Sequence, residues 1–269
     1  MIWVDMISCE AISISVITVV YNAQDRIKDT IDSVLMQDYD NIEYIIKDGG
    51  STDGTLEIIR KAAARHDNIV YFTGKDEGIY DAMNIAAFHA TGDIVEFLNA
   101  GDRFASSDVV SRAVSVMTET DSDIVFGDIL YENPDGTTNV RTYPQSCAGS
   151  LYYLTGDSIN HQGIFAKISL LKDNPFDTTM QICADREWLM RIGKIRPRKK
   201  MTSLGFTVAI YPLDGASVFN KDVYKKEAEI CVKKHFPVGY PVYAAFEFVR
   251  SNKVLAGLLH KVYKLLYIK

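Results

Sequence analysis

Three polar segments each follow a short apolar run near the start of the chain. They are KDGGSTDGT at 47–55, DEGIYDAMN at 76–84 and FLNAGD at 97–102. Carboxylate and amide side chains of this kind bind a ribose, a base or a divalent cation, and glycines let a ligand approach the backbone closely. None of the segments has the GxGxxG or GxxxxGK[ST] pattern, so neither a dinucleotide fingerprint nor a P-loop is indicated. The first segment alone is explained equally well by a capped turn between a strand and a helix.

Two segments in the second half of the chain carry side chains that could move a proton. CADREWLMR at 183–191 places Asp185 and Glu187 at the start of an amphipathic helix, where the helix dipole also favours acids. NHQGIF at 160–165 places His161 just before an apolar stretch. A general base must be a side chain of one of these types. Taken alone, however, both segments are explained better by a structural role than by chemistry.

The elements that must position these residues are predicted from hydrophobic periodicity. Helical patterns separate four apolar runs that have the character of strands, at 12–20, 42–46, 69–72 and 93–98. Strands that alternate with helices of about ten or more residues predict right-handed βαβ units and a parallel sheet. Because ligands lie outside the carboxyl ends of such strands, the three polar segments should converge in space.

The rhythm changes after Asp102. A strand at 124–130 leads to the hairpin turn NPDG at 133–136, and later patterns predict a helix at 184–192 and a strand at 206–211. Helical patterns fill the chain from residue 220 onward. The predicted class is α/β, with a Rossmann-like, mostly parallel central sheet flanked by helices, a small mixed sheet and C-terminal helices.

Charge is distributed unevenly along the 269 residues. The net charge is −6, yet the segment from Lys221 onward has 10 basic and 4 acidic residues. This balance argues against nucleic acid as a partner and suggests a basic tail that meets an anionic surface. The four cysteines have no CxxC spacing, and no apolar run suggests a signal peptide or a transmembrane helix. We therefore expect a reduced, cytoplasmic setting.

Four motifs together resemble a known family. TVVYN at 18–22, KDGGSTDGT, DEGIYDAMN and FLNAGD, in this order, resemble the family 2 glycosyltransferases with the GT-A fold, and the resemblance spans about residues 12 to 215. The bacterial branch that builds exopolysaccharide, capsule and O-antigen units is the most similar. The resemblance implies transfer of a hexosyl or N-acetylhexosaminyl group from a UDP- or GDP-sugar to a hydroxyl of a glycan or a polyprenyl-diphosphate-linked acceptor, with inversion.

The resemblance also assigns roles to residues. The acid-rich DxD element of the family falls on 99–102, where only Asp102 is an acid, so Asp102 becomes the expected ligand of Mg²⁺ or Mn²⁺. Asp185 matches the catalytic base, and His161 and Glu187 are expected acceptor contacts. The expected contacts of the nucleotide-sugar donor are Thr18, Val20, Tyr21, Asn22, Asp48, Gly49, Ser51, Asp81, Asn84, Asn99, Ala100 and Gly101.

We expect a catalytic domain at 1–219, with a nucleotide-binding half at about 12–105 and an acceptor half at 106–219, and a basic helical tail at 220–269. Within the tail, residues 255–266 place apolar side chains on one helical face and lysines on the other. This helix either packs on the core or lies on the inner face of the plasma membrane as a peripheral anchor.

Two rival functions are left open by the sequence. A sugar nucleotidyltransferase would use a related sheet, but Tyr21 and Asn22 stand where a GxGxRxxP-like start would be. A non-catalytic subunit that binds nucleotide sugars is compatible with the reduced DxD element, whereas Asp102 and Asp185 argue against it.

Overall fold

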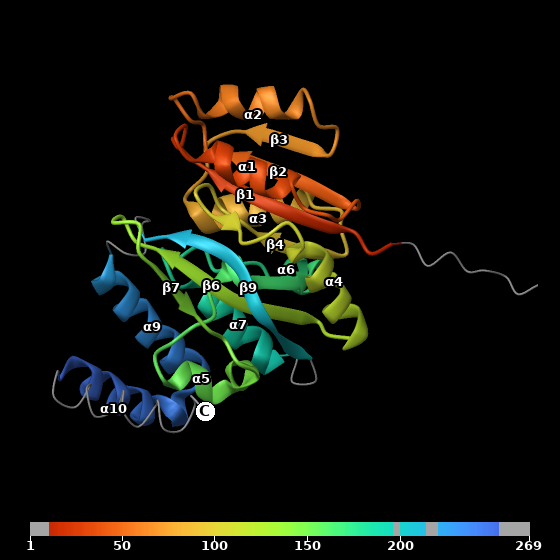
Figure 1. Cartoon of the computed structure of the whole chain (residues 1–269). Helices are drawn as coiled ribbons and strands as arrows, with labels where there is room; N and C mark the ends of the chain where they lie inside the picture. Colours follow the sequence, from red (N-terminus) through yellow and green to blue (C-terminus); the bar gives the residue numbers. More distant parts are fainter. Residues whose placement is uncertain (1–10, 196–199, 214–219, 253–269) are drawn as a thin grey trace, which may run out of the picture.

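The computed structural model describes residues 11–195, 200–213 and 220–252 (Figure 1). Its first half alternates strands and helices, as the sequence predicted. The strands are β1 (Ile14–Val20), β2 (Ile42–Asp48), β3 (Ile69–Thr73) and β4 (Ile94–Phe97). The helices are α1 (Ile27–Leu35), α2 (Thr55–Ala63) and α3 (Ile79–His89). All four strands are parallel, with β1 between β2 and β4, so their carboxyl ends share one edge of the sheet.

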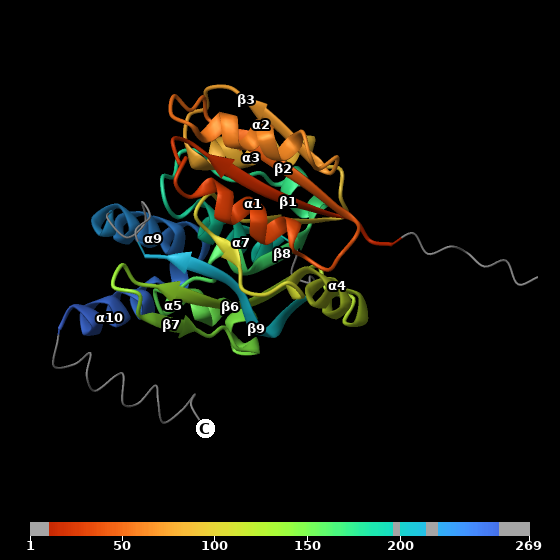
Figure 2. The same cartoon turned by 45° about the horizontal axis from the view of Figure 1, so that its top comes forward.

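The second half adds strands of both directions to the same sheet (Figure 2). Its strands are β5 (Arg103–Phe104), β6 (Ile124–Glu132), β7 (Thr138–Arg141), β8 (Ile164–Lys167) and β9 (Met201–Pro212). Its helices are α4 (Val109–Glu119), α5 (Ser150–Leu154), α6 (Ile168–Asp173) and α7 (Ala184–Ile195), with short 3-10 turns η1 (Gln145–Ala148) and η2 (His161–Gly163). Across the described residues the order is β3-β2-β1-β4-β8-β6-β9-β5, with β7 paired to β6.

The predicted α/β class is confirmed, and the mixed portion continues the central sheet. The junction is β8, which is antiparallel to both β4 and β6. Periodicity did not predict β8 because its four residues are too few to establish an alternating pattern. The strand exists through its pairing with two segments that are distant in the sequence. It thereby joins the two halves into one sheet and lies just after His161.

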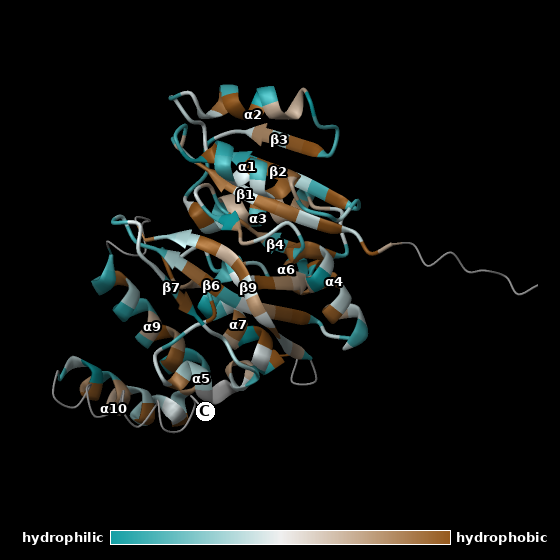
Figure 3. Cartoon of the chain, viewed as in Figure 1, coloured by the Kyte–Doolittle hydropathy of each residue, from teal (hydrophilic) through white to brown (hydrophobic). Residues whose placement is uncertain are grey.

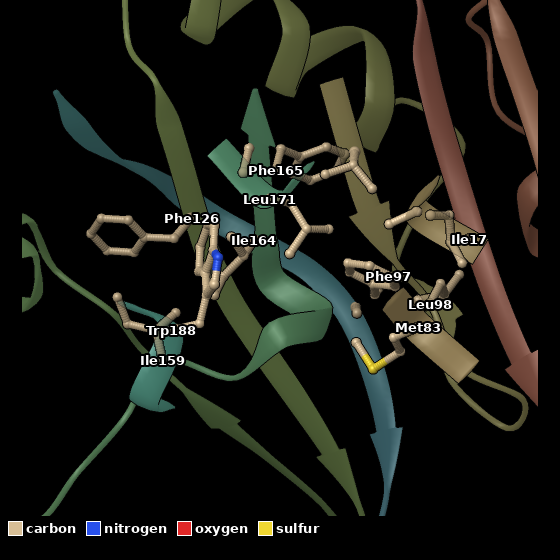
Figure 4. Close-up of a cluster of buried hydrophobic side chains, with 14 of the residues drawn as sticks. Ile17, Met83, Phe97, Leu98, Phe126, Ile159, Ile164, Phe165, Leu171 and Trp188 are labelled. Atoms are coloured by element: carbon tan, nitrogen blue, oxygen red, sulfur yellow. The ribbon is translucent and has the colours of Figure 1, made fainter. Parts of the chain in front are cut away.

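Parallel strands covered on both faces are largely apolar, and β1 follows this rule, with only Ser15 and Thr18 polar. All seven of its residues are buried. Figure 3 shows the hydrophobic colour along most of β1, whereas α2 is mixed. The core continues through both halves, from Ile17 and Met83 to Phe126 and Trp188 (Figure 4). One continuous core therefore holds the strand ends in fixed relative positions.

The C-terminal helices that the structure describes are α9 (Lys221–His235) and α10 (Tyr240–Ser251), with the turn η3 (Pro237–Gly239) between them. On α9, Ala228, Cys231 and Val232 are buried, so this part of the basic segment belongs to the folded body. The amphipathic segment predicted at 255–266 lies outside the described residues. A search of the helices in the described ranges finds none with the length and apolar character needed to cross a membrane.

Candidate active site

The ends of β1 and β2 are joined by a network of side chain to backbone hydrogen bonds. The Asp48 carboxylate, which is fully buried, accepts hydrogen bonds from the backbone N–H groups of Gly50 and Ser51 and from the Thr73 hydroxyl. The Ser51 hydroxyl accepts from the Asn22 N–H at 2.8 Å, and the Asn22 carboxamide accepts from Thr52 at 2.8 Å. These contacts hold the polar segment at 47–55 against the end of β1.

Gly49 is enclosed at this edge. A Cβ atom at this position would lie 3.1 Å from Asp76 Oδ2 and 3.3 Å from the Tyr21 ring, which is itself 63% exposed. Asp76 is fixed by an ion pair of 2.8 Å with the buried Lys47. A residue of the second polar segment, at 76–84, thus also lies at the ends of β1 and β2, beside an exposed aromatic ring.

Two of the residues assigned to the donor are placed inside the sheet. Thr18 is fully buried and donates a hydrogen bond of 2.6 Å to the Leu98 carbonyl, and Val20 is 6% exposed. The side chains of Thr18 and Val20 therefore cannot contact a ligand at the sheet edge. The reason is that β1 lies in the middle of the sheet, and only residues beyond its end are accessible. Tyr21 and Asn22 are the first such residues.

Asp81 and Asn84 lie on α3 and form hydrogen bonds with residues outside this helix. The Asp81 carboxylate accepts from the Glu77 N–H at 2.9 Å, which fixes the start of the helix. The Asn84 carboxamide exchanges two hydrogen bonds of 2.9 Å with the backbone of Phe176. Neither residue lines the large cavity described below.

The turn that follows β4 forms one wall of a cavity of about 460 Å³. The backbone holds this turn tightly: the Ala100 N–H donates to the Val19 carbonyl, and the Gly101 N–H donates to the Thr30 hydroxyl at 2.9 Å. Gly101 has a φ of +106°, which L side chains rarely adopt, so glycine is favoured here. The cavity wall includes Asn99, Ala100, Gly101 and Asp102.

A chain of polar contacts crosses the cavity from this turn to α7. The Asn99 carboxamide nitrogen lies 3.0 Å from His161 Nε2, and His161 Nδ1 lies 3.2 Å from Asp185 Oδ2. The hydroxyl of Tyr80 donates to the Ile182 carbonyl at 2.6 Å and lies 3.3 Å from Asp185 Oδ1. His161 and Asp185, which are 24 positions apart in the sequence, therefore form a side-chain pair that faces the same cavity as Asp102.

Glu187 does not reach this cavity. Its side chain is fully buried and pairs with Arg191 at 3.0 Å, Lys234 at 3.0 Å and His235 at 2.8 Å. Although burial acts to raise its pKa, these hydrogen bonds hold the pKa of Glu187 at about 2. Residues two apart on a helix lie on different faces, so Asp185 and Glu187 cannot both point into the cavity. The structure corrects the expectation that Glu187 contacts an acceptor, because its carboxylate ties α7 to α9.

The surroundings of Asp102 fit a hard divalent cation. Its carboxylate is 4% exposed, and burial raises its pKa to about 7 despite a hydrogen bond from the Gln162 side chain. The buried oxygens Asn99 Oδ1 and Gln162 Oε1 have no hydrogen-bond donor. Mg²⁺ takes oxygen ligands and commonly uses one or two carboxylates together with substrate phosphates. No group of three His, Cys, Asp or Glu side chains suited to a metal occurs in the described ranges, so the ligand set would depend on the substrate.

Several lining residues were missed by sequence reasoning. Gln162 directly follows His161, and Arg26 lies beside Gly101, whose added Cβ would be 3.6 Å from Arg26 Cδ. Arg141 and Asp157, which form an ion pair of 2.9 Å, belong to the far wall. Gln162 lies within NHQGIF, so that motif was a usable signal for it, whereas the others come from segments without a motif.

These observations define a class of protein: an α/β protein in which the carboxyl edge of a parallel sheet and a helix-borne carboxylate frame one polar cavity. A family model described as glycosyl transferase family 2 matches residues 15–209. The chain belongs to this family and is a glycosyltransferase.

Two curated relatives illustrate the similarity. An uncharacterized glycosyltransferase of Mycobacterium tuberculosis is 33% identical over 188 residues, which cover 68% of this chain and 70% of the relative. A PGL/p-HBAD biosynthesis glycosyltransferase of Mycobacterium bovis is 30% identical over 164 residues, which cover 60% of this chain and 62% of the relative.

Two solved structures share the fold. TarS of S. aureus in complex with UDP-GlcNAc has a TM-score of 0.67 and 20% identity, over 96% of this chain and 75% of that one. The mannosyltransferase PcManGT of Pyrobaculum calidifontis in complex with GDP-Man and Mn²⁺ has a TM-score of 0.60 and 18% identity, over 96% and 83%. At this identity the likeness establishes the fold, which is the expected GT-A arrangement.

Proposed function

We propose that the protein transfers a hexosyl or N-acetylhexosaminyl group from a UDP- or GDP-sugar to a hydroxyl of a glycan or polyprenyl-diphosphate-linked acceptor, with inversion. Asp185 is the base, and Asp102 holds Mg²⁺ or Mn²⁺. The observation that carries the proposal is that both carboxylates line one cavity, with His161 in contact with Asp185 at 3.2 Å.

The reaction is a single displacement. Asp185 accepts the proton of the acceptor hydroxyl, the hydroxyl oxygen forms a bond to the anomeric carbon, and the bond from that carbon to the diphosphate breaks. The hydrogen bond of 2.7 Å from the backbone N–H of Arg186 orients the Asp185 carboxylate for this step. Asp102 would hold the divalent cation, which would neutralise charge on the departing nucleoside diphosphate.

Donor binding is assigned to the carboxyl ends of β1 and β2, within the proposed nucleotide-binding half at about 12–105. Tyr21 offers an exposed ring for the base, and Gly49 permits close approach of the ligand. Asn22, Asp48 and Ser51 hold these strand ends in place through their mutual hydrogen bonds. The acceptor is assigned to the half at 106–219, which supplies His161 and the far wall of the cavity.

The test combines a donor screen with two variants. UDP- and GDP-sugars are screened by thermal shift with Mn²⁺, because a bound donor raises stability with its concentration. Release of the nucleoside diphosphate is then measured for wild type, Asp185→Asn and Asp102→Ala. We expect Asp185→Asn to keep donor binding and to lose turnover about 10²-fold or more. Near-normal turnover of Asp185→Asn would refute the assignment of the base. Release of nucleoside diphosphate by wild type would exclude a non-catalytic binding subunit.

We also propose a role in surface polysaccharide assembly of the exopolysaccharide, capsule or O-antigen kind, on the inner face of the membrane. Its support is the relative named for PGL/p-HBAD biosynthesis and the basic, amphipathic pattern at 255–266. Co-sedimentation with anionic vesicles, comparing the full chain with a variant carrying Lys253→Glu, Lys261→Glu and Lys264→Glu, tests this. Equal recovery of both proteins in the supernatant would exclude a membrane role.

A further inference from the structure

The cavity continues well beyond Asp185, to the ends of β6 and β9. This far part is lined by Tyr131, Arg141, Asn160, Tyr211 and Lys221, among others. Of these five residues, only Asn160 belongs to a motif recognised in the sequence, NHQGIF at 160–165. Pockets for small molecules are lined by aromatic side chains with a few well-placed polar groups, and this wall has that composition.

The two tyrosines become neighbours through an irregularity in the sheet. Strands β6 and β9 begin in a register that pairs Ile124 with Met201, but the register shifts between Phe126 and Ile129, so that Tyr131 pairs with Tyr211. In the starting register, Tyr131 would lie opposite Val208. Bulges of this kind often redirect side chains beside active sites.

Two glycines accompany the shift. Gly205 has a φ of +69°, and a Cβ on Gly127 would lie 2.5 Å from Val208 Cγ2. The result is an edge-to-face pair of Tyr131 and Tyr211, with ring centroids 5.8 Å apart and planes at 65°. Both rings are partly exposed and border the cavity. They therefore present an aromatic surface to anything that enters it.

Asn160 adds a directed hydrogen-bond donor. Its carboxamide oxygen accepts from the Tyr143 hydroxyl at 2.6 Å and from the Tyr131 hydroxyl at 3.2 Å. The backbone N–H of Asn160 in turn donates to the Tyr143 oxygen at 3.3 Å, so the Tyr143 hydrogen must point to the carboxamide. Because two hydroxyls fix the oxygen, the NH₂ group is oriented away from them. A ligand in the cavity is a suitable acceptor for it.

We propose that Tyr131, Tyr211 and Asn160 form a binding subsite for a pyranose ring of the acceptor. The apolar C–H face of the sugar packs on the tyrosine pair, and a sugar oxygen accepts a hydrogen bond from Asn160 Nδ2. Asn160 precedes His161, which contacts Asp185, so a ring held here has a hydroxyl directed toward the base. This inference rests on the proposed function, because it identifies the acceptor as a carbohydrate at that same site.

Saturation-transfer NMR on the full chain tests the subsite without knowledge of the true acceptor. The probes are the methyl glycosides of glucose, galactose, mannose, N-acetylglucosamine and rhamnose, each with UDP and Mg²⁺ present. We expect ring protons of at least one glycoside to be saturated by wild type. Tyr211→Phe retains the ring and should retain this signal, whereas Tyr211→Ala should reduce it about fivefold or more. Asn160→Asp keeps the carboxamide oxygen's position but removes the donor, and should also weaken the signal.

The matched control is Tyr71→Ala, which removes a tyrosine of β3 that is 36% exposed and outside this cavity, and it should leave the signal unchanged. Saturation that persists in Tyr211→Ala, or that is absent for every glycoside with wild type, overturns the proposal. Thermal shift with UDP and Mg²⁺ is recorded for each variant to check folding. If nucleotides fail to bind while glycosides bind through Tyr211, the donor assignment fails and the subsite stands.

Discussion

The replacement Asp102→Asn distinguishes the effect of the Asp102 charge on folding stability from the proposed role of this carboxylate as a metal ligand. Burial raises the pKa of Asp102 from 3.8 to about 7. One pKa unit corresponds to about 1.36 kcal/mol, so the ionised carboxylate costs the folded protein about 4 kcal/mol at pH 8. Because the pKa of Asp102 is higher in the folded state than in the unfolded state, the uncharged carboxyl contributes its full stability below about pH 4. This contribution is lost as pH rises through 7. Asparagine cannot ionise, so the stability of Asp102→Asn should not decrease in this way.

The assay is urea unfolding in EDTA at pH 4.5 and pH 8, on either side of the sequence pI of about 5.4. Fluorescence of the buried Trp188 reports the transition. We expect the advantage of Asp102→Asn over wild type to grow by about 3 kcal/mol from the lower to the higher pH. The control is Asp67→Asn, which replaces an exposed acid and makes the same change in formal charge.

Adding UDP with Mg²⁺ should then reverse the order at pH 8, because only wild type keeps the carboxylate that a cation would use. Two results would refute the reasoning. One is an Asp102→Asn protein whose relative stability is independent of pH, which would mean that the carboxylate is hydrated in the folded state. The other is equal stabilisation of both proteins by UDP and Mg²⁺, which would remove Asp102 from the metal site.

Three further predictions concern structural assignments. Glu187→Gln should destabilise the protein by about 3 kcal/mol at pH 7 in urea unfolding. The difference in stability between the variant and wild type should shrink as pH falls from 4.5 to about 2, because the contacts that lower the pKa stabilise only the ionised carboxylate. Asn84→Ala removes both hydrogen bonds to Phe176 and should lower the stability by about 1–3 kcal/mol. Its affinity for UDP, measured by calorimetry, should be unchanged. A clear loss of affinity would show that Asn84 belongs to the donor site. Gly127→Ala should lower the stability by about 1–3 kcal/mol, because the added Cβ would lie 2.7 Å from the Phe206 carbonyl oxygen. It should also weaken glycoside binding measured by NMR. A variant as stable as wild type would contradict the packing argument.

The local sequence pattern was sufficient to predict much of the secondary structure of this protein. The alternation of apolar runs and helical periods in the first hundred residues predicted four parallel strands, and β1 to β4 are present with boundaries that differ by one or two residues. The same pattern placed Asp102 after a strand and Asp185 at a helix start. These features depend on neighbours in the sequence, and hydrophobic periodicity reports such neighbours directly.

The sequence did not predict roles that depend on the direction in which a side chain points. Thr18 and Val20 lie in a motif that borders the site, yet their side chains are buried because β1 is an interior strand, paired with β2 and β4. Asp185 and Glu187 are two positions apart, yet one faces the cavity and the other is buried against α9. A motif gives the order of residues, whereas the face on which each side chain lies depends on what packs against the element.

The sequence by itself determined the class of fold, the edge of the sheet that carries the polar segments and the family. The tertiary structure alone decided that His161 contacts Asp185 and that a register shift sets Tyr131 beside Tyr211. Both contacts join segments tens of residues apart in the chain. Their geometry is fixed by the strands β6, β8 and β9, whose pairing depends on partners that local periodicity cannot identify.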